Sequence, residues 1–259
     1  MAIQGCEGSA RNWRAKIREC AGGLLPFVDL AFPPGCVSCG ELVEGSGYRH
    51  LCVACAGKID FVEEPACVTC GHPFYGDVEG ERMCPHCEGM HPAYREGRTA
   101  VLFKGAARAL VHELKYHRGL HVLEDIAEVF RRSERVMTLV ADATLIPVPL
   151  HPRKKRERGY NQSELLAEAL VKASGGRARI EALLRRVVDT ASQTGFDRKT
   201  RRTNLKNAFA LTPGGLITPG HHYILVDDVF TTGSTLNSCA GVLRRAGCLN
   251  LDVVTFGHG

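Results

Sequence analysis

The second half of the chain carries apolar residues with two different periods, which predict alternating helices and strands. Helical spacing recurs at three places before residue 171, namely Leu110 to Leu114, Val122 to Phe130 and Leu165 to Leu170. A fourth helix is predicted from Leu236 to Ala246, and Gly247 is placed to end it. Short apolar runs predict strands at residues 144–149, 183–188, 223–226 and 249–256.

This alternation is typical of an α/β fold in which helices cover both faces of a parallel sheet. We therefore predict a Rossmann-like parallel sheet in a domain at residues 96–259. Ligands of such sheets bind beyond the carboxyl ends of the strands. The loops after Pro149, Val188 and Val226 are accordingly the predicted site.

Eight of the twelve cysteines fall into four C-x-x-C pairs, which form two quartets. The first quartet is Cys36, Cys39, Cys52 and Cys55, and the second is Cys67, Cys70, Cys84 and Cys87. The sequence C-V-S-C-G at 36–40 repeats as C-V-T-C-G at 67–71, and this duplication favours two sequential zinc sites over an interleaved pair. A disulfide framework is the alternative, but such frameworks belong to small secreted domains, and no secretion signal is recognised.

Four thiolates close the coordination shell of zinc, so both ions are expected to be structural. Three histidines of the same segment, His50, His72 and His86, are not needed as ligands because each quartet is complete. We assign residues 33–92 to a tandem zinc-ribbon module. The module either braces the neighbouring domain or binds nucleic acid or protein, and bracing is favoured because few base-reading or stacking residues occur in it.

Composition is ordinary for a globular protein, with 44% hydrophobic and 24% charged residues. No apolar run approaches the length of a membrane span, and residues 1–32 are predicted to form a helical segment rather than a signal peptide. We expect a cytoplasmic protein without a membrane span. The net charge of +5 is modest, but basic residues cluster at 153–158 and 198–206, which indicates either phosphate-bearing ligands or a solvated basic surface.

The segment Y-I-L-V-D-D-V-F-T-T-G-S-T at 223–235 has the clearest functional pattern. A predicted strand ends in Asp227 and Asp228, and a loop rich in hydroxyl groups leads into a helix. Free amides at the N-terminus of a helix bind anions, which predicts a monophosphate site at residues 231–235, with Gly233 allowing the backbone to close around it. The carboxylates suit sugar hydroxyls and a metal ion. An ordinary N-cap at Ser234 or Thr235 explains one hydroxyl residue, but it does not explain four that follow two acids.

These residues resemble the phosphoribosyl pyrophosphate signature of type I phosphoribosyltransferases. The whole arrangement resembles the ComF family, because paired C-x-x-C ribbons are followed by H-E-L-K-Y at 112–116, P-V-P-L at 147–150, R-G-Y-N-Q at 158–162 and Q-T-G-F-D-R at 193–198. The resemblance covers the chain from about Pro33 onward. It implies a sheet of the type I phosphoribosyltransferase kind and an association with DNA uptake in competence.

The resemblance also implies roles for individual residues. Asp227 and Asp228 are expected to bind the ribose hydroxyls, and the 5-phosphate is expected at Thr231, Thr232, Gly233, Ser234 and Thr235. Pyrophosphate is expected at Pro149, Leu150 and His151, with counter-charge from the basic run 153–158; Arg158 therefore joins the two aspartates as catalytic. Residues 193–202 are where related transferases have a mobile hood. Four further candidates are given by motif membership, with packing or helix capping as an equal alternative: Lys115, Tyr116, Tyr160 and Asn161.

The implied reaction is phosphoribosyl transfer with Mg²⁺, in which pyrophosphate leaves C1 and an acceptor that the sequence does not identify attacks it. The protein then supplies alignment and electrostatic stabilisation. The alternative is a non-catalytic protein that senses a nucleotide and holds single-stranded DNA, for which Tyr160 and Phe196 beside the basic runs are thin support. Expected partners are phosphoribosyl pyrophosphate or a related sugar phosphate, single-stranded DNA, and a DNA-uptake helicase or similar protein.

Overall fold

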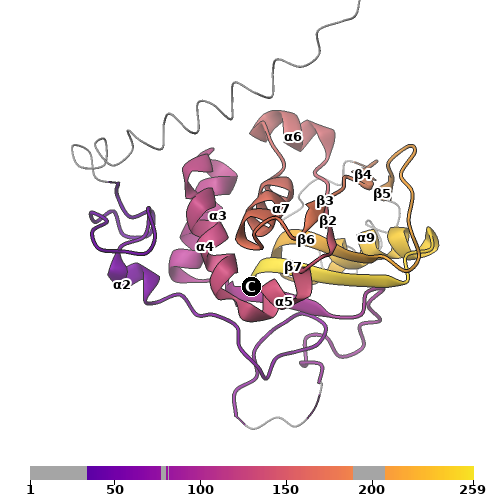
Figure 1. Cartoon of the computed structure of the whole chain (residues 1–259), viewed down its shortest axis with the longest axis horizontal. Coiled ribbons are helices and arrows are strands. Elements are labelled where there is room, and N and C mark those ends of the chain that lie inside the picture. The colour runs from indigo at the N-terminus through magenta and orange to yellow at the C-terminus, as the bar shows by residue number, and fades with distance from the viewer. Residues whose placement is uncertain (1–33, 77–79, 81, 189–207) are drawn as a thin grey trace, which may run out of the picture.

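The computed structural model describes residues 34–76, 80, 82–188 and 208–259 (Figure 1). The helical segment predicted at residues 1–32 lies outside this part of the chain. The described helices are α2 (Val53–Ala56), α3 (Gly105–Tyr116), the 3-10 turn η1 (Leu120–Val122), α4 (Leu123–Arg132), α5 (Glu134–Val140), α6 (Pro152–Arg158), α7 (Gln162–Ala173) and α9 (Ser234–Arg245). The strands are β1 (Gly97–Leu102), β2 (Thr144–Pro147), β3 (Arg179–Ile180), β4 (Leu184–Arg186), β5 (Phe209–Leu211), β6 (His222–Phe230) and β7 (Asn250–His258).

Five strands form one parallel sheet in the order β1-β7-β6-β2-β3, which confirms the predicted α/β class. The central strand β6 pairs with β7 along its whole length and with β2 from Tyr223 to Val226. Strand β2 ends at Pro147, opposite Val226, so the rest of β6 has a neighbouring strand, β7, on one side only. The sheet is therefore open beside Asp227, the first residue past that point.

The sheet has an apolar core on each face because side chains of β6 alternate between them. Ile224 and Val226 pack with helices α3, α4, α5 and α7, whereas Tyr223 and Leu225 pack with α9 and the β4–β5 pair. The helical spacing read from the sequence is confirmed here, since the apolar residues of α3, α4, α7 and α9 are the buried ones.

Strands β2 and β6 lie next to each other, but the chain leaves them in opposite directions. From β2 it passes through α7 to the edge strand β3, and from β6 it passes through α9 to β7 on the other side. Such a reversal opens a crevice at the carboxyl ends of the two strands, where ligands of α/β sheets bind. The fold thus directs attention to the segments after Pro147 and around Asp227.

Three details of the predicted elements were wrong. The strand placed at 223–226 continues to Phe230, because β7 supplies hydrogen-bonding partners as far as His258. The basic run 153–158 is helix α6 rather than a loop, with Pro152 in its first turn and Gly159 in a left-handed conformation after it. The edge strand β1 was not predicted.

The strand placed at 183–188 is also wrong as a member of the parallel sheet. Its central part, β4, pairs antiparallel with β5 in a separate two-stranded unit. Leu183 and Leu184 are buried against the core that contains α9, and this burial gives the apolar run that suggested a sheet strand. The member of the sheet at this position is the short, exposed β3, which has only two residues.

The cysteine-rich segment docks along β1, the edge strand at the other end of the sheet (Figure 1). Its first half packs on the face covered by α3 and α4 through Tyr48 and Leu51, and its second half packs on the opposite face through Met90 and Tyr94. The two ribbons therefore pack on opposite sides of the domain, the first against the helical layer and the second against β1. Among the described residues, no helix is both long and apolar enough to cross a membrane.

Candidate functional site

A cavity of about 320 Å³ lies beyond the carboxyl end of β6, at the crevice that the topology predicts. Its floor is the segment from Asp227 to Leu236, and Lys115 of α3, Phe103 and Gly259 close its sides. All seven residues that were predicted to hold ribose and phosphate line this one cavity: Asp227, Asp228, Thr231, Thr232, Gly233, Ser234 and Thr235. Their roles stay predictions, but the structure brings them together.

The turn from β6 into α9 gives that helix an N-cap residue without a side chain, and the hydroxyl of Thr232 accepts the N–H of Ser234 at 3.4 Å. Gly233 is the N-cap residue, in the left-handed region at φ +66°, where other residues are strained. The hydroxyl of Thr232 donates to that of Ser234 (3.0 Å), so these side chains pair with each other. No acidic residue occupies the first turn of α9. A helix N-terminus of this kind attracts an anion, and the ordinary N-cap at Ser234 or Thr235 is ruled out.

The two carboxylates are held by different groups from the helices on one face. The hydroxyl of Ser163 donates to Asp227 (3.0 Å), which also accepts the backbone N–H of Asp228 (2.9 Å). Asp228 is 7% exposed and accepts from the amide of Gln162 (3.0 Å). The ammonium of Lys115 lies 2.9 Å from Asp228. Among the residues that the structure describes, Lys115 is the cation in contact with this pair of carboxylates.

Burial, together with the neighbouring charge of Asp228, raises the pKa of Asp227 from 3.8 to about 7. The hydrogen bond from Ser163 and the charge of Lys115 act in the opposite direction without cancelling the effect. The ionised form of such a carboxyl is stabilised when a cation or hydroxyl donors bind beside it. This donor set fits Mg²⁺, which prefers carboxylate oxygens, and it equally fits sugar hydroxyls.

Of the remaining candidates from the sequence, some contact the carboxylate network and others have structural roles. Arg158 donates to the side chain of Gln162, and Gln162 in turn bonds to Asp228, so Arg158 is linked to the carboxylate pair through one residue. Asn161 caps α7 and donates to the carbonyl of Val148 (3.0 Å), which is a structural role.

Two tyrosines that flank this network behave differently from each other. The hydroxyl of Tyr160 donates to the backbone carbonyl of Leu114, so this side chain ties α3 to the segment before α7. Tyr116 is 65% exposed, and the guanidinium of Arg158 lies over its ring at 6.0 Å. The capping-or-packing alternative therefore holds for Tyr160 and Asn161, whereas Lys115 contacts the site.

The predicted pyrophosphate segment lies outside the lining of the cavity, and the predicted hood lies outside the described residues. Pro149, Leu150 and His151 follow β2 but do not line the cavity, and His151 accepts the N–H of Arg153 as the cap of α6. Their contact with pyrophosphate stays a prediction. The hood expected at 193–202, and the basic run 198–206, lie outside the described residues.

Sequence reasoning missed three residues of the site. Gln162 and Ser163 open α7 and hold the two aspartates, and Phe103 forms a side of the cavity. Gln162 ends the motif R-G-Y-N-Q, so its motif membership was a signal. Phe103 follows a strand that was not predicted, and no local pattern marks it.

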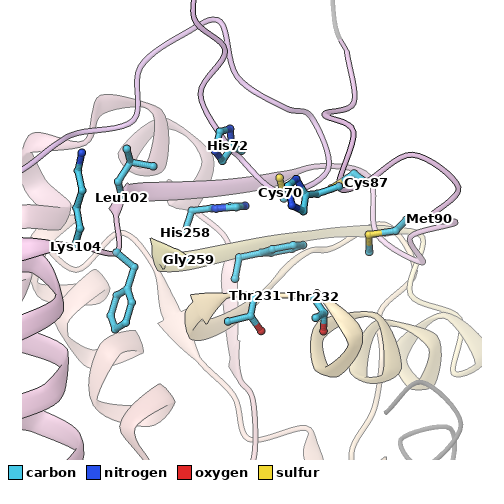
Figure 2. Close-up of a pocket in the computed structure, with 13 residues that line it drawn as sticks. Cys70, His72, Cys87, Met90, Leu102, Lys104, Thr231, Thr232, His258 and Gly259 are labelled. Atoms are coloured by element: carbon cyan, nitrogen blue, oxygen red, sulfur yellow. The ribbon is translucent and has the colours of Figure 1, made fainter. Parts of the chain in front are cut away.

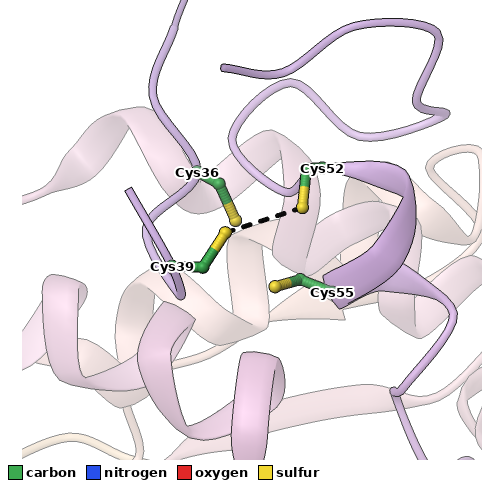
Figure 3. Close-up of side chains that lie close together, drawn as sticks. All are labelled: Cys36, Cys39, Cys52 and Cys55. Carbon is green, nitrogen blue, oxygen red and sulfur yellow. Dashed lines mark hydrogen bonds between the residues drawn. The ribbon is translucent and has the colours of Figure 1, made fainter. Parts of the chain in front are cut away.

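Eight cysteines form two compact groups, each made of one complete quartet in sequential order. Figure 3 shows the first of them, Cys36, Cys39, Cys52 and Cys55. Within each group all four sulfur atoms lie within 4.8 Å of one another; the sulfurs of Cys39 and Cys52 are 3.7 Å apart, and those of Cys70 and Cys84 are 3.6 Å apart. Four sulfurs at 2.3 Å from a tetrahedral zinc are about 3.8 Å apart. The described cysteines are free thiols, so the disulfide alternative is wrong and the sequential arrangement is confirmed. Both groups fit zinc.

The first ribbon is attached to the domain through a buried carboxylate on α4. Asp125 is 2% exposed and accepts the backbone N–H groups of Arg49 (2.7 Å) and His50 (2.8 Å). The ring of His50 lies 3.2 Å from the same carboxylate. The second ribbon is attached through β1, where the hydroxyl of Thr99 donates to the carbonyl of Cys70 (3.0 Å). These contacts support the bracing role.

Comparison with known proteins assigns the chain to a family. Residues 27–88 match the model of a double zinc ribbon domain. Competence protein F of Haemophilus influenzae is 29% identical over 220 residues, which cover 80% of this chain and 96% of that protein. The DNA utilization protein YhgH of Escherichia coli O6:H1 is 30% identical over 211 residues, which cover 80% of this chain and 89% of that protein. The chain belongs to the ComF family. The family assignment made from the motifs is thereby confirmed, and it spans both the ribbons and the α/β domain.

Among solved structures, a hypoxanthine phosphoribosyltransferase from Staphylococcus aureus is similar over 52% of this chain and 62% of its own. The two are 14% identical, and the TM-score is 0.33. A similarity of this size carries no argument about ligand or activity. The assignment of the site in this ComF-family chain rests on the residues of the cavity itself.

Proposed function

We propose that this ComF-family protein binds phosphoribosyl pyrophosphate with Mg²⁺ in the cavity beyond β6 and transfers phosphoribose to an acceptor. The observation that carries the proposal is the composition of that cavity, in which two carboxylates and a helix N-terminus with a glycine N-cap lie on one continuous segment. The carboxylates suit the hydroxyls of a ribose, and the helix N-terminus suits its phosphate. In this proposal residues 96–259 form the transferase-like domain and residues 33–92 form the zinc-ribbon module.

Each part of the site has a task in such a transfer. Thr231 to Thr235 hold the 5-phosphate, and Asp227 and Asp228 fix the ribose in one orientation. Lys115 and Gln162 keep the carboxylate of Asp228 aimed at the cavity, since both contact it directly. When bound, Mg²⁺ neutralises charge on the phosphate oxygens.

The leaving pyrophosphate needs positive charge on the side of the cavity nearest α6. Arg158, the last residue of α6, does not line the cavity, but it donates to Gln162, so its guanidinium is positioned by a side chain that also touches Asp228. We assign it to stabilise the departing pyrophosphate, because a preorganised cation lowers the barrier for developing negative charge. No side chain of the protein needs to become covalently attached.

The proposal is tested by comparing two ligands on the same protein. Phosphoribosyl pyrophosphate with Mg²⁺ contains the ribose, and inorganic pyrophosphate with Mg²⁺ does not. The substitution Asp228→Asn is expected to weaken binding of the ribose-containing ligand about tenfold or more and to leave the fold intact, since it removes one charged hydrogen-bond acceptor. Asp142→Asn, at an exposed ion pair with Arg177, is the matched control. Equal affinity of the wild type and Asp228→Asn for phosphoribosyl pyrophosphate would refute the role of this carboxylate.

The alternative is a non-catalytic protein that senses a nucleotide and holds single-stranded DNA. Tyr116 favours it, because an exposed ring beside the guanidinium of Arg158 resembles a stacking platform. Helix α6 argues against it, since Arg153 pairs with Glu157 and Lys155 pairs with Glu164, which neutralises part of its charge. Affinity for single-stranded DNA that falls steeply with salt and is lost in Tyr116→Ala would favour this alternative.

A further inference from the structure

The two cysteine quartets differ in how far solvent reaches them. All four cysteines of the second quartet are buried, and none is more than 4% exposed. In the first quartet Cys36 is buried, Cys52 and Cys55 are half-buried, and Cys39 is exposed. Two sites of the same composition therefore present their sulfurs to solvent very differently.

The contrast comes from what covers each ribbon, because the turn that starts each quartet is duplicated. Gly40 and Gly71 follow the first C-x-x-C pair of their ribbons and have similar backbone angles, φ +81° and +73°. A Cβ added at Gly71 would lie 2.7 Å from the backbone nitrogen of Thr99 in β1. A Cβ added at Gly40 would meet no atom of the described residues within 4 Å. The same turn is thus pressed against the sheet in the second ribbon and open in the first.

The second quartet stays screened even where it borders a cavity. Cys70 and Cys87 line a space of about 290 Å³ between their ribbon and the ends of β1, β6 and β7 (Figure 2). Each of these two cysteines is nevertheless only 1% exposed. The backbone beside them is held in place, because the buried hydroxyl of Tyr94 donates to the carbonyl of Thr69 (3.0 Å). An oxidant in the cavity therefore has little access to the sulfurs.

The first ribbon is held to the domain by the loop between its two cysteine pairs. Tyr48 and Leu51 of this loop are buried against the core that contains α3 and α4, and Asp125 accepts two of its backbone N–H groups. Leu42 and Val53, close in sequence to the cysteine turns, are 56% and 58% exposed. The ribbon is anchored through its loop, and its cysteine turns face solvent.

Exposure decides reactivity in such a site. Coordination to zinc keeps the thiols ionised, and the thiolate is the form that oxidants attack. Among thiolates, the accessible one is oxidised first. Here that one is Cys39, and the sulfur of Cys52 lies 3.7 Å from it, close enough to complete a disulfide after a small movement (Figure 3).

We propose that Cys39 and Cys52 form a thiol-oxidation site through which peroxides act on the first ribbon and spare the second. Hydrogen peroxide oxidises the thiolate of Cys39 to a sulfenic acid, as its O–O bond breaks and one hydroxide leaves. The thiolate of Cys52 then attacks that sulfur, so the S–S bond forms and a second hydroxide leaves. Two electrons pass in total from the two sulfurs to the peroxide. The disulfide leaves two thiolates in the quartet, too few for a closed zinc site.

The consequence is release of the first ribbon from α4. Small metal ribbons fold only with their ion, so the loop that Asp125 holds through Arg49 and His50 loses its shape when the ion is lost. Oxidation then uncovers the apolar surface of α3 and α4 on which Tyr48 and Leu51 pack. This inference goes beyond the proposed function, since it depends on neither the ligand nor the reaction of the sugar-phosphate cavity.

The test treats zinc-loaded, full-length protein with hydrogen peroxide and follows zinc release with a chromogenic chelator. Remaining thiols are then alkylated, and disulfides are mapped by mass spectrometry. We expect one ion per chain to be released about tenfold or more faster than the other, with a disulfide between Cys39 and Cys52. Cys70→Ser and Cys39→Ser, which should hold only the first and only the second ion, are the matched pair: peroxide should release the ion quickly from Cys70→Ser and slowly from Cys39→Ser.

Hydrogen exchange on the wild type measures the release of the ribbon. The amides of Arg49 and His50 should exchange faster after oxidation, whereas the amide of Gly97, which donates to Val68 of the second ribbon (2.7 Å), should not change. Reduction with added zinc should restore the original exchange.

The outcomes separate the steps of the proposal. Retention of both ions, release of both at the same rate, earlier release of the second ion, or a disulfide that lacks Cys39 or Cys52 would overturn the oxidation site. The wild-type measurements decide this even if one of the single-site variants does not fold. A Cys39–Cys52 disulfide with unchanged exchange at Arg49 and His50 would overturn the release of the ribbon.

Discussion

The attachment of the first ribbon depends on one buried carboxylate, and this makes Asp125→Asn a sharp perturbation. The substitution keeps the shape of the side chain, so no cavity forms. It replaces one carboxylate oxygen by an NH2 group, which cannot accept the N–H of Arg49 or of His50. One backbone donor is then left facing another donor in a site where the side chain is only 2% exposed.

The magnitude follows from these contacts. Hydrogen bonds to a charged group contribute about 1.5–3 kcal/mol each, and an unsatisfied buried donor costs about 1–3 kcal/mol. Loss of one charged bond and weakening of the other give a destabilisation of about 3 kcal/mol. In a chain of this size that shifts the urea midpoint by about 1 M.

Urea unfolding followed by far-UV circular dichroism measures the effect, with zinc content determined before each titration. Asp142→Asn is the control, because Asp142 lies at an exposed ion pair with Arg177 and should give no measurable change. A midpoint for Asp125→Asn equal to that of the wild type would show that this carboxylate does not hold the ribbon to α4.

Three further predictions follow from the site and the ribbons. Folding raises the pKa of Asp227 from 3.8 to about 7, so the wild type should lose stability relative to Asp227→Asn as the pH rises from about 4 to about 7, with no further change above pH 7. Urea unfolding of both proteins without added Mg²⁺ measures this difference, and a difference that does not vary with pH would contradict the prediction. Gly233→Ala puts a Cβ against Phe230 at a positive φ and should weaken sugar-phosphate binding about tenfold, whereas Gly241→Ala inside α9 should bind as the wild type does and be about 0.5–1 kcal/mol more stable; calorimetry and thermal melts test both, and equal affinities of the two variants would speak against the loop geometry. Cys39→Ser and Cys70→Ser should each lower bound zinc by one ion per chain, measured by elemental analysis after dialysis; retention of both ions in either variant would disprove two independent sites.

Local patterns predicted the parts of the site that are continuous in sequence. The segment 223–235 has its acids, glycine and hydroxyls in order on one strand–loop–helix unit, so its chemistry could be read before its fold. The two cysteine quartets were also predictable, since C-x-x-C spacing and duplication are local. The α/β class followed from the alternation of buried strands and amphipathic helices.

Contacts between distant segments could not be predicted in this way. Asp125 and His50 are 75 residues apart, and Gln162 and Asp228 are 66 apart, so nothing in their neighbourhood marks them as partners. The apolar pair Leu183 and Leu184 is compatible with an antiparallel two-stranded sheet as well as with a strand of a parallel sheet, which is why β4 was placed in the wrong sheet. The raised pKa of Asp227 depends on burial that only the fold supplies.

The central claim is that the cavity beyond β6 binds a phosphorylated ribose. Calorimetric titration of the protein with phosphoribosyl pyrophosphate and Mg²⁺ tests it most directly, with the double variant Asp227→Asn/Asp228→Asn as control. We expect saturable binding at one site per chain in the wild type and none in the control. Absence of binding in the wild type, or equal binding in both proteins, would contradict the account.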